Sequence, residues 1–155
     1  RQPEAEMGIL TDDMKRVIAE QRLGFVATVC PDGTPNLSPK GTTAVWDDEH
    51  LVFADICSPD TIRNLAGNPA IEINVVDVTL RKGYRFKGTA AILTDGPVFE
   101  AVKQRTSNPV RHVVLIRVTR AAAVVSPAYD GGDNERDIAQ RWDRHWDELR
   151  KARDG

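Results

Sequence analysis

Apolar and polar residues alternate along the middle of the chain, and this pattern predicts strands. Residues 70–76 and 84–90 place apolar side chains at every second position, which is typical of a strand with one buried face and one solvated face. Runs rich in β-branched and apolar residues, separated by turn segments such as Pro31-Asp32-Gly33, predict further strands. Six strands are expected, over residues 24–30, 34–46, 50–55, 70–76, 84–90 and 110–126.

Short connections join the first three of these strands, so an antiparallel meander of consecutive neighbours is the simplest arrangement. Helical spacing with capping residues predicts short helices near residues 12–23, 58–66 and 95–102. These helices do not alternate regularly with the strands, which disfavours a doubly wound parallel sheet. A mainly β fold with short helices, built as a closed or partly closed antiparallel barrel, is therefore predicted.

The C-terminal part of the chain has a different composition. After a turn-rich stretch, residues 133–153 are mostly charged and place Trp142, Trp146 and Leu149 on one stripe, which predicts an amphipathic helix. Trp142 and Trp146 lie four residues apart, and such a pair more often covers its own domain than contacts a partner. We expect residues 1–155 to form a single domain with this helix at its end.

Composition narrows the possible functions. The 155 residues include 21 Lys and Arg against 23 Asp and Glu, a net charge of −2, so nothing favours binding to nucleic acid or to an anionic membrane. The longest apolar run is about five residues, far short of the roughly 20 that a spanning helix needs. Residues 1–6 contain two acids and no apolar core, so no signal peptide is recognised there. A cytoplasmic protein is expected.

The common catalytic and nucleotide-binding motifs are missing. The glycines form neither GxGxxG nor GxxxxGK[ST], which disfavours the usual Rossmann and P-loop sites. Cys30 and Cys57 have no zinc-ligand spacing, so no metal site is expected. The three histidines have no nucleophile in a recognisable context, and no pair of carboxylates stands out from the turns and helix starts.

Two polar segments remain as candidates for binding. Residues 36–43 place hydroxyl groups, Lys40 and Gly41 in an expected strand, where Pro and Gly often mark a bulge or the close approach of another molecule. Residues 58–64 place backbone N–H groups, two hydroxyls and Arg63 at a helix start, which favours an anion such as phosphate. An irregular edge strand and simple helix capping would explain the same residues. Taken together, the two segments suggest one phosphorylated ligand held between them.

The order of motifs from Leu23 to about Gly96 resembles the pyridoxamine 5′-phosphate oxidase-like family of FMN-binding split barrels. The family implies a six-stranded antiparallel split β-barrel and a homodimer with FMN in clefts between the subunits. The matching stretches are Gly24-Phe25-Val26-Ala27-Thr28-Val29, Asp32-Gly33-Thr34-Pro35-Asn36-Leu37-Ser38-Pro39, Thr61-Ile62-Arg63-Asn64-Leu65 with Asn68-Pro69, Gly83-Tyr84-Arg85-Phe86-Lys87-Gly88-Thr89-Ala90 and Leu93-Thr94-Asp95-Gly96-Pro97-Val98-Phe99-Glu100.

The resemblance also implies which residues bind the cofactor. One set would line the flavin ring and ribityl chain: Ser38, Pro39, Lys40, Gly41, Thr42 and Thr43. A second set would lie near the phosphate: Ser58, Thr61, Ile62, Arg63 and Asn64. This chain departs from the family at Asp60, where Arg or Lys is common, so a deazaflavin such as F420 is kept as an alternative to FMN.

The leading hypothesis for function is a flavin-dependent oxidoreductase that acts on a small, unidentified substrate. No equivalent of the family's pyridoxal-phosphate substrate site is recognised, so vitamin B6 oxidation is not the first choice. Two alternatives stay open. One is a flavin-binding or electron-transfer protein without a dedicated substrate, and the other is a cofactor-free dimeric interaction module that uses the C-terminal helix as its contact surface.

Overall fold

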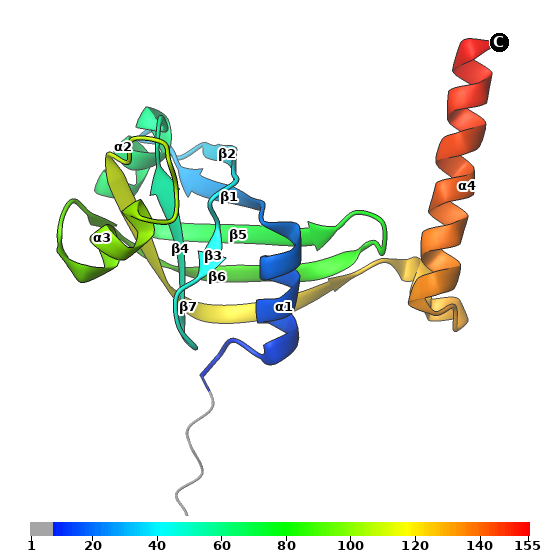
Figure 1. Cartoon of the computed structure of the whole chain (residues 1–155), viewed down its shortest axis with the longest axis horizontal. Coiled ribbons are helices and arrows are strands. Elements are labelled where there is room, and N and C mark those ends of the chain that lie inside the picture. Colours follow the sequence, from blue (N-terminus) through cyan, green and yellow to red (C-terminus); the bar gives the residue numbers. More distant parts are fainter. Residues whose placement is uncertain (1–7) are drawn as a thin grey trace, which may run out of the picture.

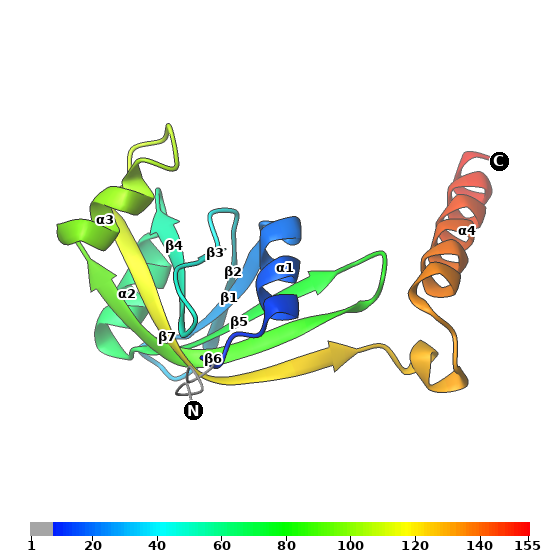
Figure 2. The ribbon, with the colours of Figure 1, turned by 60° about the horizontal axis from the view of Figure 1, so that its bottom comes forward.

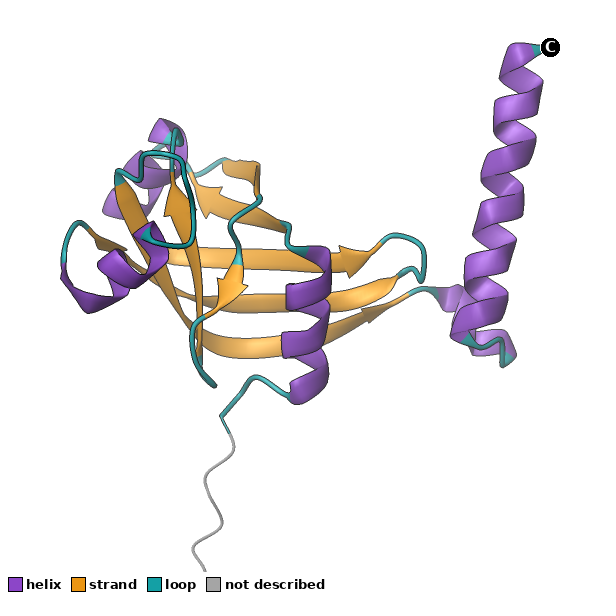
Figure 3. Ribbon diagram, viewed as in Figure 1, coloured by secondary structure: helices purple, strands orange, loops and turns teal. Residues whose placement is uncertain are grey.

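The computed structural model describes residues 8–155, and residues 1–6, where no signal peptide is recognised, lie outside that range. The fold is mainly β with short helices, as predicted (Figures 1 and 3). The strands are β1 (Gly24–Val29), β2 (Pro35–Lys40), β3 (Ala44–Val45), β4 (His50–Asp55), β5 (Ala70–Asp77), β6 (Lys82–Leu93) and β7 (His112–Val125). The helices are α1 (Asp12–Gln21), α2 (Pro59–Gly67), α3 (Gly96–Lys103), the 3₁₀ turn η1 (Pro127–Gly131) and α4 (Glu135–Asp154).

The strands form one antiparallel sheet in the order β2-β1-β5-β6-β7-β4-β3. Within residues 8–155 it has seven strands, so the predicted number of six is wrong. Both pairings of the predicted meander are present, as β1–β2 and β3–β4, but they lie at opposite edges of the sheet because the predicted middle strand is divided into β2 and β3. The expected strand 34–46 is broken at residues 41–43, where Thr43 N donates to Lys40 O at 3.3 Å and Thr43 Oγ1 donates to the same oxygen at 2.8 Å. This tight turn sends β2 to one edge of the sheet and β3 to the other.

The break at residues 41–43 also explains why the sheet curls. The strands β2 and β3 are the two edges of the sheet, yet Lys40 and Ala44 are only four Cα–Cα steps apart, which is at most about 15 Å. A flat seven-stranded sheet would separate its edges by about 29 Å, given strand spacings near 4.8 Å. The sheet must therefore fold around until its edges approach, and Figure 2 shows the resulting half-barrel.

A β-bulge bends the long hairpin of β6 and β7. The register runs from Lys82 opposite Val125 to Lys87 opposite Arg120, then shifts so that Gly88 lies opposite Val118. A Cβ atom on Gly88 would lie 2.2 Å from the carbonyl oxygen of Arg117, so only glycine fits there without a shift of the backbone. The extra residue increases the local bend and twist, which helps the sheet to curl.

The concave side of the sheet holds the main core, which includes Val26, Ile73, Phe86 and Ile116. The apolar stripe of α1 covers part of this core through Val17 and Ile18. A second apolar cluster lies where α3 packs on β4 and β7, formed by Val52, Ala54, Phe99, Val102 and Val113. Because α1 and α3 pack on separate clusters, the surface between them is not filled by either helix.

The helix α4 extends away from the barrel beyond the β5–β6 hairpin (Figures 1 and 2). Only its start contacts the body: Ile138 is buried, and the guanidinium of Arg81 lies 4.0 Å from the centre of the Trp142 ring. Farther along, Trp146 and Leu149 are 48% and 47% exposed. No helix within residues 8–155 is long and apolar enough to cross a membrane.

The bulge gives a test of the fold. We expect Gly88→Ala to lower the free energy of unfolding by roughly 1–3 kcal/mol, because the new methyl group meets the backbone of β7. Gly67→Ala, at the end of α2 with open space around its Cα, should leave stability unchanged or slightly raised. Urea unfolding of both variants measures the difference, and equal stabilities would contradict the close approach at Gly88.

Candidate functional site

The two polar segments identified in the sequence meet at Lys40. This residue ends β2 and is buried, with 7% of its surface exposed. Its Nζ donates hydrogen bonds to Ser38 Oγ at 2.8 Å and to Ser58 Oγ at 2.7 Å. Ser58 is the N-cap of α2, and its hydroxyl makes no capping bond to the helix because it points to Lys40. The ammonium group therefore ties the edge strand to the start of α2.

A buried carboxylate, Asp55, lies next to this cation. It ends β4 with 2% exposure, and its two oxygens accept hydrogen bonds from Ser58 N at 2.7 Å and His112 Nδ1 at 2.8 Å. Burial lowers the pKa of Lys40 from its ordinary value, and the charge of Asp55 opposes that shift. Asp55 and His112 were not predicted from the sequence. An acid that ends an apolar strand just before a capping serine is the signal that could have pointed to Asp55.

The turn between β2 and β3 is fastened to β4 by hydroxyl groups. Thr42 Oγ1 accepts a hydrogen bond from Ala54 N at 2.9 Å and donates to Ala54 O at 3.3 Å. Thr43 is buried against Gly24, where a Cβ atom would lie 2.6 Å from Thr43 Oγ1. Gly41 is exposed at the tip of the turn. Three of the predicted residues, Gly41, Thr42 and Thr43, therefore lie together on the short hydrogen-bonded turn between β2 and β3.

The predicted residues of α2 do not all face the same way. Thr61 and Asn64 are buried, and Asn64 Nδ2 donates to Thr28 Oγ1 at 3.1 Å. Ile62 packs against the main core, whereas Arg63 is exposed and pairs with Asp60 at 3.3 Å. The carboxylate of Asp60 is therefore at the surface beside a cation. Of the remaining predicted residues, Pro39 is exposed on β2.

A groove of about 780 Å³ lies beside the turn that holds Gly41, Thr42 and Thr43. This volume is within the range of roughly 300–1,000 Å³ that is usual for small-molecule and cofactor sites. Its walls come from α1, the turn with β3, the middle of β4, and the end of α3 with the residues that follow it. The lining residues are Lys15, Ile18, Ala19, Arg22, Gly41, Thr42, Thr43, Ala44, Val45, Val52, Ala54, Val102, Arg105 and Thr106.

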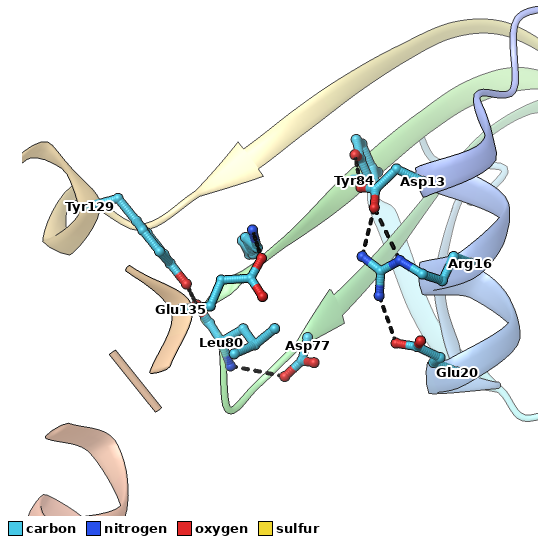
Figure 4. Close-up of polar contacts among 9 residues, drawn as sticks. Asp13, Arg16, Glu20, Asp77, Leu80, Tyr84, Tyr129 and Glu135 are labelled. Atoms are coloured by element: carbon cyan, nitrogen blue, oxygen red, sulfur yellow. Dashed lines mark hydrogen bonds and ion pairs between the residues drawn. The ribbon is translucent and has the colours of Figure 1, made fainter. Parts of the chain in front are cut away.

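One wall of the groove, α1, is fastened to the sheet by a polar cluster on its other side (Figure 4). Tyr84 Oη on β6 donates a hydrogen bond to Asp13, whose other oxygen accepts from Arg16 Nε at 3.2 Å. Arg16 also pairs with Glu20 at 2.9 Å. The hydrogen bond from Tyr84, followed by that from Arg16, lowers the pKa of Asp13 from its ordinary value.

Residues 10–125 match the sequence profile of a family described as pyridoxamine 5′-phosphate oxidase. The chain belongs to this family. The matched range runs from just before α1 to the end of β7, so it contains every predicted cofactor-binding residue. The helix α4 lies beyond it.

Known structures agree with this assignment. HupZ from Group A Streptococcus superposes with a TM-score of 0.71 and 37% identity over 76% of this chain and 95% of that chain. An F420 reductase matches with a TM-score of 0.59 and 25% identity over 73% of this chain and 98% of that chain. An FMN-binding protein from Syntrophomonas wolfei shares the fold, with a TM-score of 0.64 and 17% identity over 73% and 84% of the two chains.

An uncharacterised protein of Methanocaldococcus jannaschii is 27% identical over 97 residues, which are 61% of this chain. The match spans 64% of that relative, less than two thirds of its length.

The residues around Lys40 fit a phosphorylated flavin in their chemistry. A buried ammonium, two serine hydroxyls and the backbone N–H groups at the start of α2 are donors suited to a phosphate or to the polar edge of a flavin ring. Asp60 does not oppose this fit, because its charge is at the surface beside Arg63. Asp55 does add a negative charge, but it is already engaged by Ser58 N–H and His112.

The attachment of α1 predicts a pH dependence. Because the pKa of Asp13 is lowered in the folded state, its contribution to stability is present above the ordinary aspartate pKa of about 4 and is lost as the pH falls through the lowered value. Asp13→Asn should therefore reduce the urea midpoint at pH 7 and have a smaller effect near pH 3. Asp147→Asn on α4 is the control. A difference from wild type that persists unchanged at pH 3 would contradict this role.

Proposed function

We propose that the protein binds a phosphorylated flavin-type cofactor, FMN or the deazaflavin F420, and uses it as an oxidoreductase on a small substrate. The observation that carries the proposal is the Lys40 cluster, in which two polar segments 18 residues apart are joined beside a cofactor-sized groove. Membership of the pyridoxamine 5′-phosphate oxidase family supports it. The names of two structural neighbours, an F420 reductase and an FMN-binding protein, are in keeping with either cofactor.

In this proposal the strand end and the turn hold the flavin ring and its ribityl chain, through Ser38, Pro39, Lys40, Gly41, Thr42 and Thr43. The phosphate lies toward the start of α2, near Ser58, Thr61, Ile62, Arg63 and Asn64. The flavin would supply the redox chemistry, and the chain would orient it and adjust its electronic properties. The short hydrogen-bonded connection through Thr42 keeps that surface rigid, which a positioned cofactor requires.

Oligomeric state is part of the proposal. The chain acts as a homodimer with the cofactor at the subunit interface, and residues 1–155 form one split-barrel domain with α4 at its end. The edge strand β2 carries exposed Leu37 at 68% exposure, and β1 carries half-exposed Phe25, so this corner of the sheet offers apolar surface for such a contact.

The cofactor site predicts the effect of two substitutions. We expect Lys40→Ala and Thr61→Ala each to weaken FMN binding by about 1–3 kcal/mol, the usual size of a lost hydrogen bond to a charged group. Lys40→Met removes the charge but retains the apolar part of the side chain, and we expect it to weaken FMN binding by a similar amount. If only Lys40→Ala weakened binding, the loss would come from poorer packing and not from the missing charge. Quenching of flavin fluorescence during titration measures the affinity. Thr79→Ala, at the exposed tip of the β5–β6 hairpin, is the matched control.

The same titrations with F420 decide between the cofactors. Tighter binding of one cofactor, together with its reduction or oxidation during turnover of a candidate substrate, would identify the redox partner. Wild-type affinity in all three site variants, measured on folded protein, would contradict the proposed site. If the folded wild-type protein binds neither cofactor, the flavin function itself is wrong.

A further inference from the structure

The second half of α4 has no packing partner within residues 8–155. Every residue from Asp143 to Asp154 is exposed, and Figures 1 and 2 show this part of the helix extending away from the barrel. Isolated helices shorter than about 12–15 residues are marginally stable in water, because most helices in proteins are stabilised by the packing of an apolar face. This half of α4 is therefore a helix whose stabilising neighbour is not supplied by the described part of its own chain.

The start of α4, in contrast, is fixed to the turn between β5 and β6. Glu135 pairs with Lys82, and just before the helix Tyr129 Oη donates to Leu80 O at 2.5 Å (Figure 4). Trp142 is the last residue of the helix that is partly buried. Because helices bend sharply only at special positions such as proline, and α4 contains no proline, these contacts also set the direction of the exposed half. The exposed half cannot fold back onto the barrel while they are made.

The aromatic and apolar positions of α4 follow one regular spacing. Ile138, Trp142, His145, Leu149 and Ala152 are separated by four, three, four and three residues. This is the spacing of the contact positions a and d in a coiled coil, which form a seam against a second helix. Ile138 is buried against the barrel, whereas the other four continue the same seam into solvent.

The charges beside the seam are complementary to those of a second copy of the same helix. Arg141 and Glu148 both occupy position g, which flanks the seam, and they are seven residues apart. When two identical helices pack antiparallel and overlap along nearly their whole length, each Arg141 lies beside the partner's Glu148. The same overlap places the large ring of Trp146 beside the partner's Ala139, so a large side chain meets a small one.

An antiparallel arrangement also suits the aromatic residues of the seam. In a parallel pair, Trp142 would meet the partner's Trp142 and His145 would meet the partner's His145. In the antiparallel pair, each Trp142 lies opposite the partner's His145. The same two residue types already contact each other edge to face within one helix, with ring centres 5.5 Å apart.

We propose that α4 is a self-association element, which packs antiparallel against α4 of a second copy of this chain along the seam from Trp142 to Ala152. The matched family range ends at residue 125, so this surface lies outside the family's common fold. It is also distinct from the β1–β2 corner and from the candidate cofactor site. The proposal therefore goes beyond the proposed function and does not depend on flavin binding.

Distances between spin labels on two copies test the arrangement. Single labels are attached to cysteine at Arg136, Asp143 or Arg150, which share a face away from the seam, in the full chain with Cys30 and Cys57 replaced by serine. Double electron–electron resonance should give the shortest distance for Asp143, near the centre of the antiparallel pair. The labels at Arg136 and at Arg150 should be farther apart and similar to each other, because each pair is displaced by about 20 Å along the axis.

This pattern distinguishes the possible arrangements without reference to total mass, so that association through the barrel cannot imitate it. Three equal distances would indicate a parallel pair and would overturn the proposal. A distance at Asp143 that is absent, or no shorter than the other two, would overturn it as well, since α4 would then contact its own barrel or a different partner.

Reversal of the two flanking charges tests the contact itself. We expect Arg141→Glu and Glu148→Arg each to weaken the pairing by about 5- to 20-fold, because like charges then face each other. The double variant should restore the affinity to within about threefold of wild type. Dilution of the protein labelled at Asp143, with loss of the short distance, measures these affinities. Asp147→Arg makes the same charge change as Glu148→Arg on the side of the helix away from the seam, and is the matched control.

Rescue by the double variant is the decisive result. Arg141 also pairs with Asp133 of its own chain, so a loss in Arg141→Glu alone has two explanations, but Asp133 cannot account for a rescue by Glu148→Arg. Within one helix the two positions are about 10.5 Å apart along the axis, beyond the spacing at which side chains of a helix pair. Failure of the double variant to recover, or equal pairing in all variants, would contradict the antiparallel contact.

Discussion

The enclosure of a positive charge at Lys40 is the constraint on which the candidate site depends. A buried ammonium group is costly unless polar groups surround it, and here two serine hydroxyls accept its hydrogen bonds while Asp55 lies close by. Asp55 is in turn held by Ser58 N–H and His112. This one cluster therefore connects the edge strand β2 to β4, β7 and the start of α2, and β2 reaches these elements only when the sheet curls.

The curl and the site have the same origin in the chain. The turn at residues 41–43 joins the two edge strands, so that the sheet closes on itself, and the same residues form the surface between the Lys40 cluster and the groove. The hydroxyl of Thr42 fixes this turn to Ala54, near the end of β4. Positions that shape the barrel and positions that line the candidate site are thus neighbours. Pro39 lies on the edge strand β2, where proline is tolerated, and Gly41 lies in the turn that follows it.

Local patterns in the sequence were sufficient to predict most of the elements. Alternation predicted β5 and β6 to within a few residues, and the Pro and Gly signals around Ile62 predicted α2. The strand order could not be predicted in this way, because β4 pairs not only with β3, its neighbour along the chain, but also with the distant β7, whose His112 is 57 residues from Asp55. The break of the strand 34–46 depends on Thr43 binding the carbonyl of Lys40, and the local pattern does not distinguish that from a continuous strand.

The same difference between local and long-range information applies to the candidate site. Lys40 and Ser58 were identified because hydroxyls and a cation stand out in a strand and at a helix start. Asp55 and His112 were missed, since their contact exists only once β4 pairs with β7. The family resemblance supplied the expectation of a flavin-type cofactor, whereas the residues alone predicted only a phosphorylated ligand.

Chemical-shift mapping of the backbone amides during addition of FMN, and separately of F420, tests the central claim most directly. The account predicts that one cofactor shifts the amides of residues 38–45 and 58–64 together, including Lys40 and Thr61, and leaves α4 unaffected. Shifts confined to other parts of the barrel, or none with either cofactor at saturating concentration, would contradict it.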